Sequence, residues 1–121
     1  MAKVILHMLN PAGMQRMYDR QRTQEESAVW LLRQGVYSTL LFGDVDMYNE
    51  DAAEEMFDLT NNPGRHEERT QRYGHGRSLS TGDIVQVDET LYLCCSMGWK
   101  VLHVELPPIN RITEPGHFKQ A

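Results

Sequence analysis

Three short apolar segments follow one another in the C-terminal half of the chain, at residues 83–87, 90–96 and 99–106. Only two residues separate each segment from the next, and a connection that short joins two strands as a hairpin. Pro107 and Pro108 follow, and because proline has no N–H to donate to a ladder, we expect the sheet to end before them. This half of the chain is therefore predicted to be an antiparallel meander of three strands.

A helix is predicted over residues 24–34. Thr23 and Glu26 have the spacing of a capping box, in which the threonine hydroxyl accepts from the glutamate N–H and the carboxylate reaches back to the threonine N–H. Apolar residues recur behind this pair at helical spacing. Gly35 stands where a left-handed C-cap belongs, so the helix is expected to end just before it.

Two further strands and a second helix are predicted in the N-terminal half. The apolar runs at residues 4–9 and 36–42 are typical of buried strands, and Gly43 is expected to end the second run. Asn49 has the side chain of an N-cap for the second helix. That helix must end before Pro63, because the residue that precedes a proline is pushed out of the α region.

The predicted order of elements is β-α-β-α-β-β-β, which is the order of an α+β fold. We expect two helices to pack on one face of a mostly antiparallel sheet. Residues 1–108 are predicted to form a single domain, and residues 109–121 a loosely attached C-terminal tail.

The charge balance disfavours one class of partner, and the apolar pattern another. With 12 Lys+Arg against 17 Asp+Glu, the net charge is −5, which opposes the general binding of duplex DNA. No apolar run approaches the ~20 residues that span a bilayer. The N-terminal residues also lack the pattern of a signal peptide. We therefore expect a cytoplasmic protein that makes no membrane contact.

No motif points to catalysis or to a bound cofactor. The chain has no Gly-x-Ser-x-Gly elbow, no Walker A loop and no dinucleotide fingerprint after a strand. Cys94 and Cys95 are adjacent, so on a strand they point to opposite faces and cannot form a relaxed disulfide. We assign no catalytic, cofactor-binding or metal-binding residue, and we predict a protein that is not an enzyme.

One motif resembles a known family. Residues 78–85 read SLSTGDIV, and Tyr92 and the sequence Gly98-Trp99-Lys100 follow at the spacing of a later hairpin. This pattern resembles the YodL-like domain, and residues 50–106 are similar to that segment as a whole. The family comprises small proteins of Gram-positive bacteria, plasmids and phages. The resemblance implies a bacterial cytoplasm or a mobile element that infects it.

Residues 65–77 are predicted to form an exposed, polar loop that carries basic residues. Five of its side chains are candidates for contact with a partner: Arg65, Arg69, Arg72, His75 and Arg77. A solvated loop, a nucleic-acid contact and a protein contact are all compatible with this composition. The two histidines of the loop match no standard metal-site spacing.

The second predicted helix carries an acidic face. Glu50, Glu54 and Asp58 recur at every fourth position, where like charges repel each other by a few tenths of a kcal/mol per pair. This face is either simply solvated or a contact for a basic partner. Trp99, after the glycine of the last predicted turn, is a further candidate for partner binding.

These observations together favour a small, non-enzymatic accessory protein. We expect it to be encoded by a phage or other mobile element and to bind and modulate a host protein, with counter-defence as one setting. The alternative is a nucleic-acid-binding module that uses the basic loop at residues 65–77. The opposite charge clusters also permit self-association into a homodimer.

Overall fold

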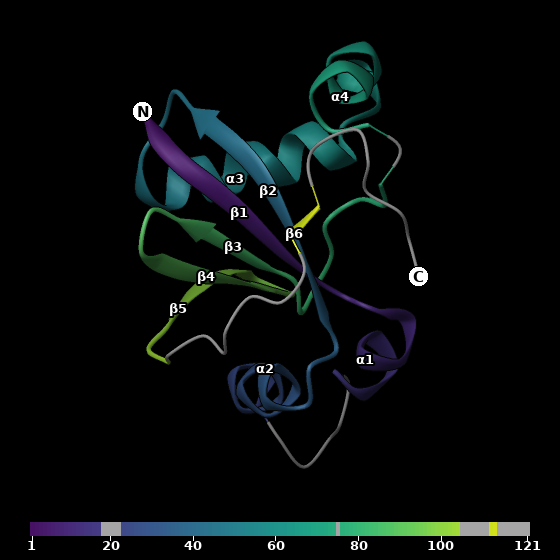
Figure 1. Ribbon diagram of the computed structural model, residues 1–121, viewed down its shortest axis with the longest axis vertical. Helices are drawn as coiled ribbons and strands as arrows, with labels where there is room; N and C mark the ends of the chain where they lie inside the picture. Colours follow the sequence, from purple (N-terminus) through teal and green to yellow (C-terminus); the bar gives the residue numbers. More distant parts are fainter. Residues whose placement is uncertain (18–22, 75, 105–111, 114–121) are drawn as a thin grey trace.

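The computed structural model describes residues 1–17, 23–74, 76–104 and 112–113. Along the chain (Figure 1) lie β1 (Ala2–Leu9), α1 (Pro11–Arg16), α2 (Gln24–Arg33), β2 (Tyr37–Val45), α3 (Asn49–Asn61), the 3-10 turn η1 (Pro63–Arg65), α4 (His66–Arg72), β3 (Ile84–Val87), β4 (Thr90–Cys95), β5 (Gly98–Leu102) and β6 (Ile112–Thr113). The predicted α+β fold class is confirmed, and so is the order of the main helices and strands.

The sheet has the strand order β5-β4-β3-β1-β2-β6. All neighbours are antiparallel except β6, which pairs parallel to β2. The N-terminal strand β1 is therefore central, and the predicted meander β3-β4-β5 forms one side of the sheet. Of the predicted tail at residues 109–121, the structure describes β6 and nothing else.

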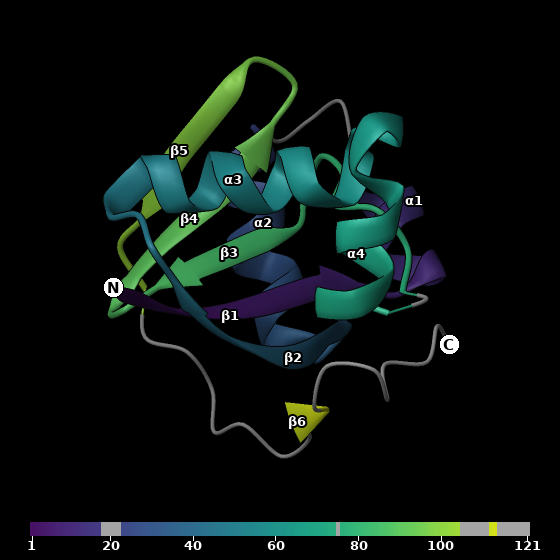
Figure 2. The same cartoon turned by 90° about the horizontal axis from the view of Figure 1, so that it is seen from above.

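The two main helices lie on opposite faces of the sheet, so the prediction that both pack on one face is wrong. Figure 2 shows α3 in front of the sheet and α2 behind it. In β1, Leu6 packs in the same core cluster as Met56 of α3, whereas Leu9 packs with Leu31 of α2. Strands with both faces covered carry near-continuous apolar runs, and the run at residues 4–9 has that form.

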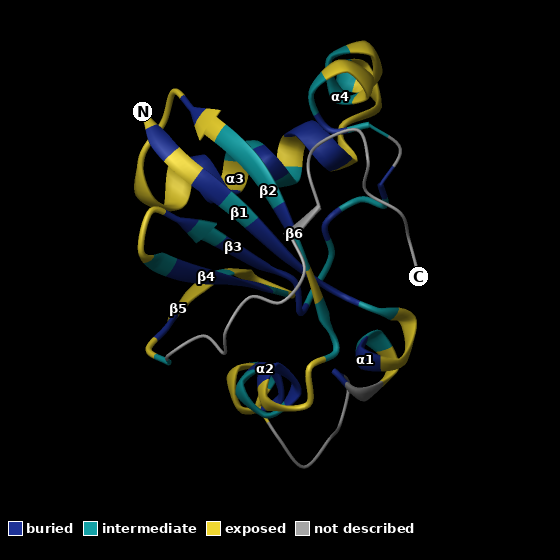
Figure 3. Ribbon diagram, in the orientation of Figure 1, coloured by how far each residue is buried: buried dark blue, intermediate teal, exposed yellow. Residues whose placement is uncertain are grey.

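The hydrophobic core therefore consists of two clusters, one on each face of the sheet. Figure 3 shows buried residues along β1, β3 and β4 and on the inner sides of α2 and α3. The cluster on the α3 face also contains Tyr73 and Leu79, which come from the segment between α4 and β3. That segment is thus tied into the core, although most of its neighbours in sequence are polar.

Strand β2 does not end at Gly43 but continues to Val45. Its pairing with β1 skips a residue at this point, since Val4 faces Gly43 and Ile5 faces Leu41. Gly43 has a φ of +119°, a value that glycine adopts without a Cβ clash. The glycine therefore absorbs a bulge inside the strand instead of terminating it.

The ends of the helices match the predictions only in part. Thr23 caps α2 by accepting from the N–H of Glu26, and Gly35 follows the helix with a φ of +68°. In α3, however, Tyr48 occupies the N-cap position without a side-chain cap bond. Asn49 is the first helical residue and has a φ of +55°.

The prediction of an exposed loop over residues 65–77 is wrong. The chain forms η1 and then α4, in which no residue is fully buried. The Asn62 side chain accepts from the N–H of Gly64 at the start of this region. Side-chain pairs at helical spacing then join Arg65 to Glu68 and Glu68 to Arg72. Such pairs stabilise a helix that is polar all round.

Candidate functional site

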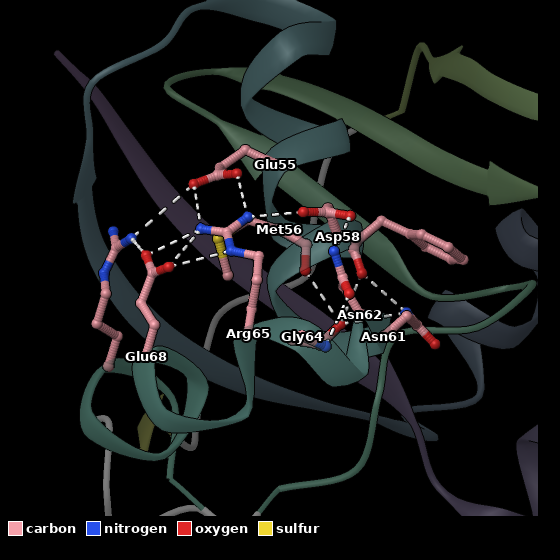
Figure 4. A network of polar contacts seen from close by, with 11 residues as sticks. Glu55, Met56, Asp58, Asn61, Asn62, Gly64, Arg65 and Glu68 are labelled. Atoms are coloured by element: carbon pink, nitrogen blue, oxygen red, sulfur yellow. Dashed lines mark hydrogen bonds and ion pairs between the residues drawn. The ribbon is translucent and has the colours of Figure 1, made fainter.

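Arg65 is the centre of a carboxylate network between α3 and α4. Its guanidinium lies 2.6 Å from Glu55, 2.8 Å from Asp58 and 2.9 Å from Glu68 (Figure 4). The hydrogen bond with Glu55, followed by those with Glu68 and Asp58, raises the pKa of Arg65 above its ordinary value. The positive charge of Arg65 is therefore paired with carboxylates of the same chain and is not available to a partner.

Arg72 and Arg69 are also bound to the chain itself. Arg72 donates to Glu68 at 2.9 Å, and its guanidinium lies 5.3 Å from the centre of the Phe42 ring. Arg69 donates to the carbonyl of Gly76 and lies 5.6 Å from the centre of the Tyr73 ring. Both arginines hold α4 against neighbouring parts of the structure.

Arg77 has a different environment, because its partner is completely buried. The two guanidinium nitrogens donate to the two carboxylate oxygens of Asp83 at 2.6 and 2.7 Å. Burial acts to lower the pKa of Arg77, and the hydrogen bond and charge of Asp83 raise it, with a net increase. A bidentate pair of this kind fixes geometry as well as charge.

Besides Arg77, the Asp83 carboxylate binds two backbone N–H groups, one at the end of β1 and one in the turn before β3. Its carboxylate accepts from the N–H of Leu9 at 2.9 Å and from the N–H of Ser80 at 2.9 Å. Arg77 also donates to the carbonyl of Leu9. The SLSTGDIV motif therefore joins the end of β1 to the start of β3. Its aspartate has a structural role here that requires no catalysis.

The four described arginines among the five basic candidates consequently do not form a free basic surface. Four of them, Arg65, Arg69, Arg72 and Arg77, contact other residues of the chain, and His75 lies outside the described residues. Their engagement was not visible in the sequence, because Glu55 and Asp83 lie ten and six residues from their arginines.

The acidic face of α3 is divided between three roles. Asp58 pairs with Arg65, whereas Glu54 accepts from the indole N–H of Trp99 at 2.7 Å. Trp99 is half-buried and packs edge-to-face on Phe57, with ring centres 6.3 Å apart. Glu50 is exposed, and no described residue forms an ion pair with it.

A continuous exposed surface precedes and includes the first turn of α3. Residues 46–51 are all exposed and comprise Asp46, Met47, Tyr48, Asn49, Glu50 and Asp51. We call them the 46–51 surface. Met47 and Tyr48 are 40% and 60% exposed, and a shallow hollow of about 350 Å³ is lined by residues 47–51. Two large side chains are thus exposed next to each other among three carboxylates.

Sequence reasoning identified Glu50 but missed Met47 and Tyr48. The available signal was two large apolar residues in a short connection that is otherwise polar. Tyr48 also reaches the N-terminus, since its hydroxyl accepts from the Met1 amino group at 2.6 Å. This bond attaches the 46–51 surface to the start of β1.

The two cysteines of the chain lie on β4 and are poorly ionised. Burial raises the pKa of the Cys94 thiol to about 12, and burial also raises the pKa of Cys95, so neither thiol is a ready nucleophile. Both cysteines are free. Within this part of the chain, no three metal-binding side chains lie together, and no helix is long and apolar enough to cross a membrane.

No protein-family model, curated protein or solved structure matches this chain. The resemblance of residues 78–100 to the YodL-like domain therefore stays a prediction.

Proposed function

We propose that this protein is a non-enzymatic binding protein whose partner is a protein with a basic surface. The single observation that carries the proposal is the 46–51 surface, in which Met47 and Tyr48 stand exposed among the carboxylates of Asp46, Glu50 and Asp51. Interfaces of this kind combine aromatic or methionine anchors with a polar rim. In the bacterial cytoplasm that the YodL-like resemblance implies, the partner is a host protein whose activity the binding modulates.

The arrangement of the arginines supports a protein partner over nucleic acid. Phosphate binding requires cations that are free to displace counterions. Arg65 and Arg72 share their charge with α3 and α4 carboxylates, and Arg77 is paired with the buried Asp83. The free charge near residues 46–51 is negative. An acidic surface attracts basic proteins at long range and raises their rate of association.

The test compares proteins captured from a bacterial lysate by three forms of the chain. The site variant is Glu50→Gln/Asp51→Asn, which removes two carboxylates from the first turn of α3. The control is Glu25→Gln/Glu67→Gln, which removes two exposed carboxylates from the first turns of α2 and α4. Both variants change the net charge by two, and in both the carboxylates removed come from the first turn of a helix.

We expect wild type and control to retain a common protein that the site variant loses, and we expect retention to weaken as salt is raised. Equal capture by all three forms would place the contact elsewhere. If the captured material is instead nucleic acid that nuclease treatment removes, the alternative function is favoured, in which residues 65–77 bind nucleic acid.

A further inference from the structure

Within the described residues, the outer edge of strand β5 is not paired with another strand. Strand β5 is the terminal strand of the order, and among the described residues it pairs only with β4. Met97, in the turn before β5, is 94% exposed, and Val101 within the strand is 40% exposed. An open edge presents unpaired N–H and C=O groups that can accept a further strand.

The hydrogen bonds of Cys94 show which groups of β5 point outward. The N–H of Cys94 donates to the carbonyl of Asp83, and its own carbonyl accepts from the N–H of Gly82, so both groups face the β3 side. Because antiparallel pairing alternates along a strand, the next residues on either side turn toward β5. They pair there with Gly98 and Lys100. Trp99 and Val101 therefore direct their backbone groups away from the sheet.

A second copy of this chain fits the edge poorly. In the two-fold antiparallel register that uses both outward-facing residues, Trp99 pairs with Val101 of the other copy, and the two Lys100 side chains stand directly opposite each other. Like charges in that position are destabilising, and lysine on an edge strand is a common protection against self-pairing. The net charge of −5 also repels a second copy.

The side of β5 that faces α3 favours a basic occupant. Trp99 points to that side, where its ring packs on Phe57 and its N–H binds Glu54 at 2.7 Å. Val101 lies two residues further and so on the same side. Glu50 is one helical turn before Glu54, exposed and without an ion pair among the described residues. A guanidinium or ammonium group there would meet carboxylates and an aromatic ring.

We infer that the protein partner contributes an extended basic segment that pairs with the outer edge of β5 as an additional strand. Alternate side chains of this segment are basic and lie on the α3 side, beside Trp99 and Glu54. The chain-to-chain hydrogen bonds form with Trp99 and Val101. This inference rests on the proposed function for the nature of the partner, but it is carried by the edge of the sheet with Trp99 and Glu54, and of the 46–51 surface it uses only Glu50.

The decisive variant is Val101→Pro. Because the N–H of Val101 points away from β4, the proline removes a donor from the outer edge without removing a bond of the sheet, and an edge strand tolerates proline at such a position. Val101→Thr is the matched control, since it keeps the N–H and the β-branched shape. The probe is a short peptide that alternates arginine and valine, compared with one that alternates glutamate and valine.

Binding is followed by amide chemical shifts and by hydrogen exchange of ¹⁵N-labelled full-length protein. In wild type and in V101T, we expect the arginine–valine peptide to change the chemical shifts of the backbone amides at positions 99 and 101. We also expect it to slow the hydrogen exchange of these two amides. We expect the glutamate peptide to do so much less. V101P should bind the arginine peptide about tenfold more weakly, as the loss of an edge hydrogen bond predicts.

Several outcomes would overturn the inference. The first is a Trp99 amide that still exchanges rapidly in wild type at saturating arginine–valine peptide. The second is equal affinity of V101P and wild type for that peptide. The third is protection of the β5 amides in the free protein that rises with protein concentration, which would indicate pairing with a second copy. If V101P does not fold, the wild-type protection pattern decides alone. A lysate partner lost by Glu50→Gln/Asp51→Asn but kept by V101P would refute strand addition and leave the proposed function standing.

Discussion

Gly82 combines a positive φ with the close approach of two neighbouring side chains, and both disfavour a Cβ at this position. Its φ is +96°, and an added Cβ would lie 2.7 Å from Leu9 and 2.8 Å from Met17. In the sequence, Gly82 stands directly before the predicted strand at residues 83–87, and glycine permits such a backbone angle at a turn. The sequence alone does not predict that Leu9 of β1 and Met17, just after α1, approach this glycine, because their approach depends on the tertiary fold.

Gly98 allows the two effects at Gly82 to be separated. It has a similar φ of +89°, but nothing lies within 4 Å of an added Cβ. We expect Gly98→Ala to lower the free energy of unfolding by about 1 kcal/mol, from backbone strain alone. Gly82→Ala should cost a further 1–3 kcal/mol, roughly, because Leu9 and Met17 must move. Urea denaturation measures both; equal losses would show that the clash is relieved.

His7 makes the stability depend on pH. The side chain is buried in β1, with ring nitrogens 3.1 Å from the Thr39 hydroxyl and 2.9 Å from the Gln86 side-chain oxygen. Desolvation lowers the pKa of His7, and the hydrogen bond with Gln86 opposes part of that effect. Below the ordinary pKa of about 6.5, the unfolded chain therefore binds a proton more readily than the folded protein does.

We expect the contribution of His7 to the free energy of unfolding to be fully present above about pH 6.5. This contribution should decrease progressively as the pH falls from there toward the pKa of His7 in the folded protein. Urea midpoints measured at several pH values should show this slope in wild type and a reduced slope in His7→Gln. His103→Gln is the control, because His103 is exposed. A slope that persists in His7→Gln would assign the effect to other groups.

Among the elements, strands β1 to β5 and helix α2 were predictable, whereas α4 and the short strand β6 were not. Strands β1, β3 and β4 owe their form to apolar runs that any sheet would bury, and α2 carries its own cap and C-terminal glycine. Helix α4 buries no residue completely, and an arginine network joins it to α3. A search for periodic apolar residues cannot detect such a helix, because charged pairs and not apolar burial stabilise it.

Arg65→Met should therefore loosen α4 while the sheet remains intact. We expect a loss of about 1 kcal/mol in unfolding free energy at low salt, and less at high salt, because the network is partly exposed and screened. The amides of α4 should exchange faster with solvent, and those of β1 should not. Arg33→Met, at the exposed end of α2, is the control. Unchanged exchange in α4 would mean that Arg65 does not hold the helix.

For the molecule as a whole, the distribution of charge decides which macromolecule it can approach. The excess of five negative charges, together with arginines that are paired internally, predicts no measurable binding of duplex DNA at physiological salt. Fluorescence anisotropy of a labelled duplex tests this directly. Micromolar affinity that falls with salt at a log–log slope of about −0.9 per phosphate contact would reverse the choice between the two functions.

The central place of β1 has a consequence for how the chain is made. Strand β1 leaves the ribosome before the other strands of this sheet, and it pairs on one side with β3, where His7 faces Ile84 and Val4 faces Val87. These partners follow about 80 residues later in the chain, so α1, α2, β2, α3 and α4 must emerge before β1 is paired along both of its edges. During that interval its apolar run is open to any other strand. We therefore expect the yield of native protein to respond to translation speed and to chaperones that shield nascent strands.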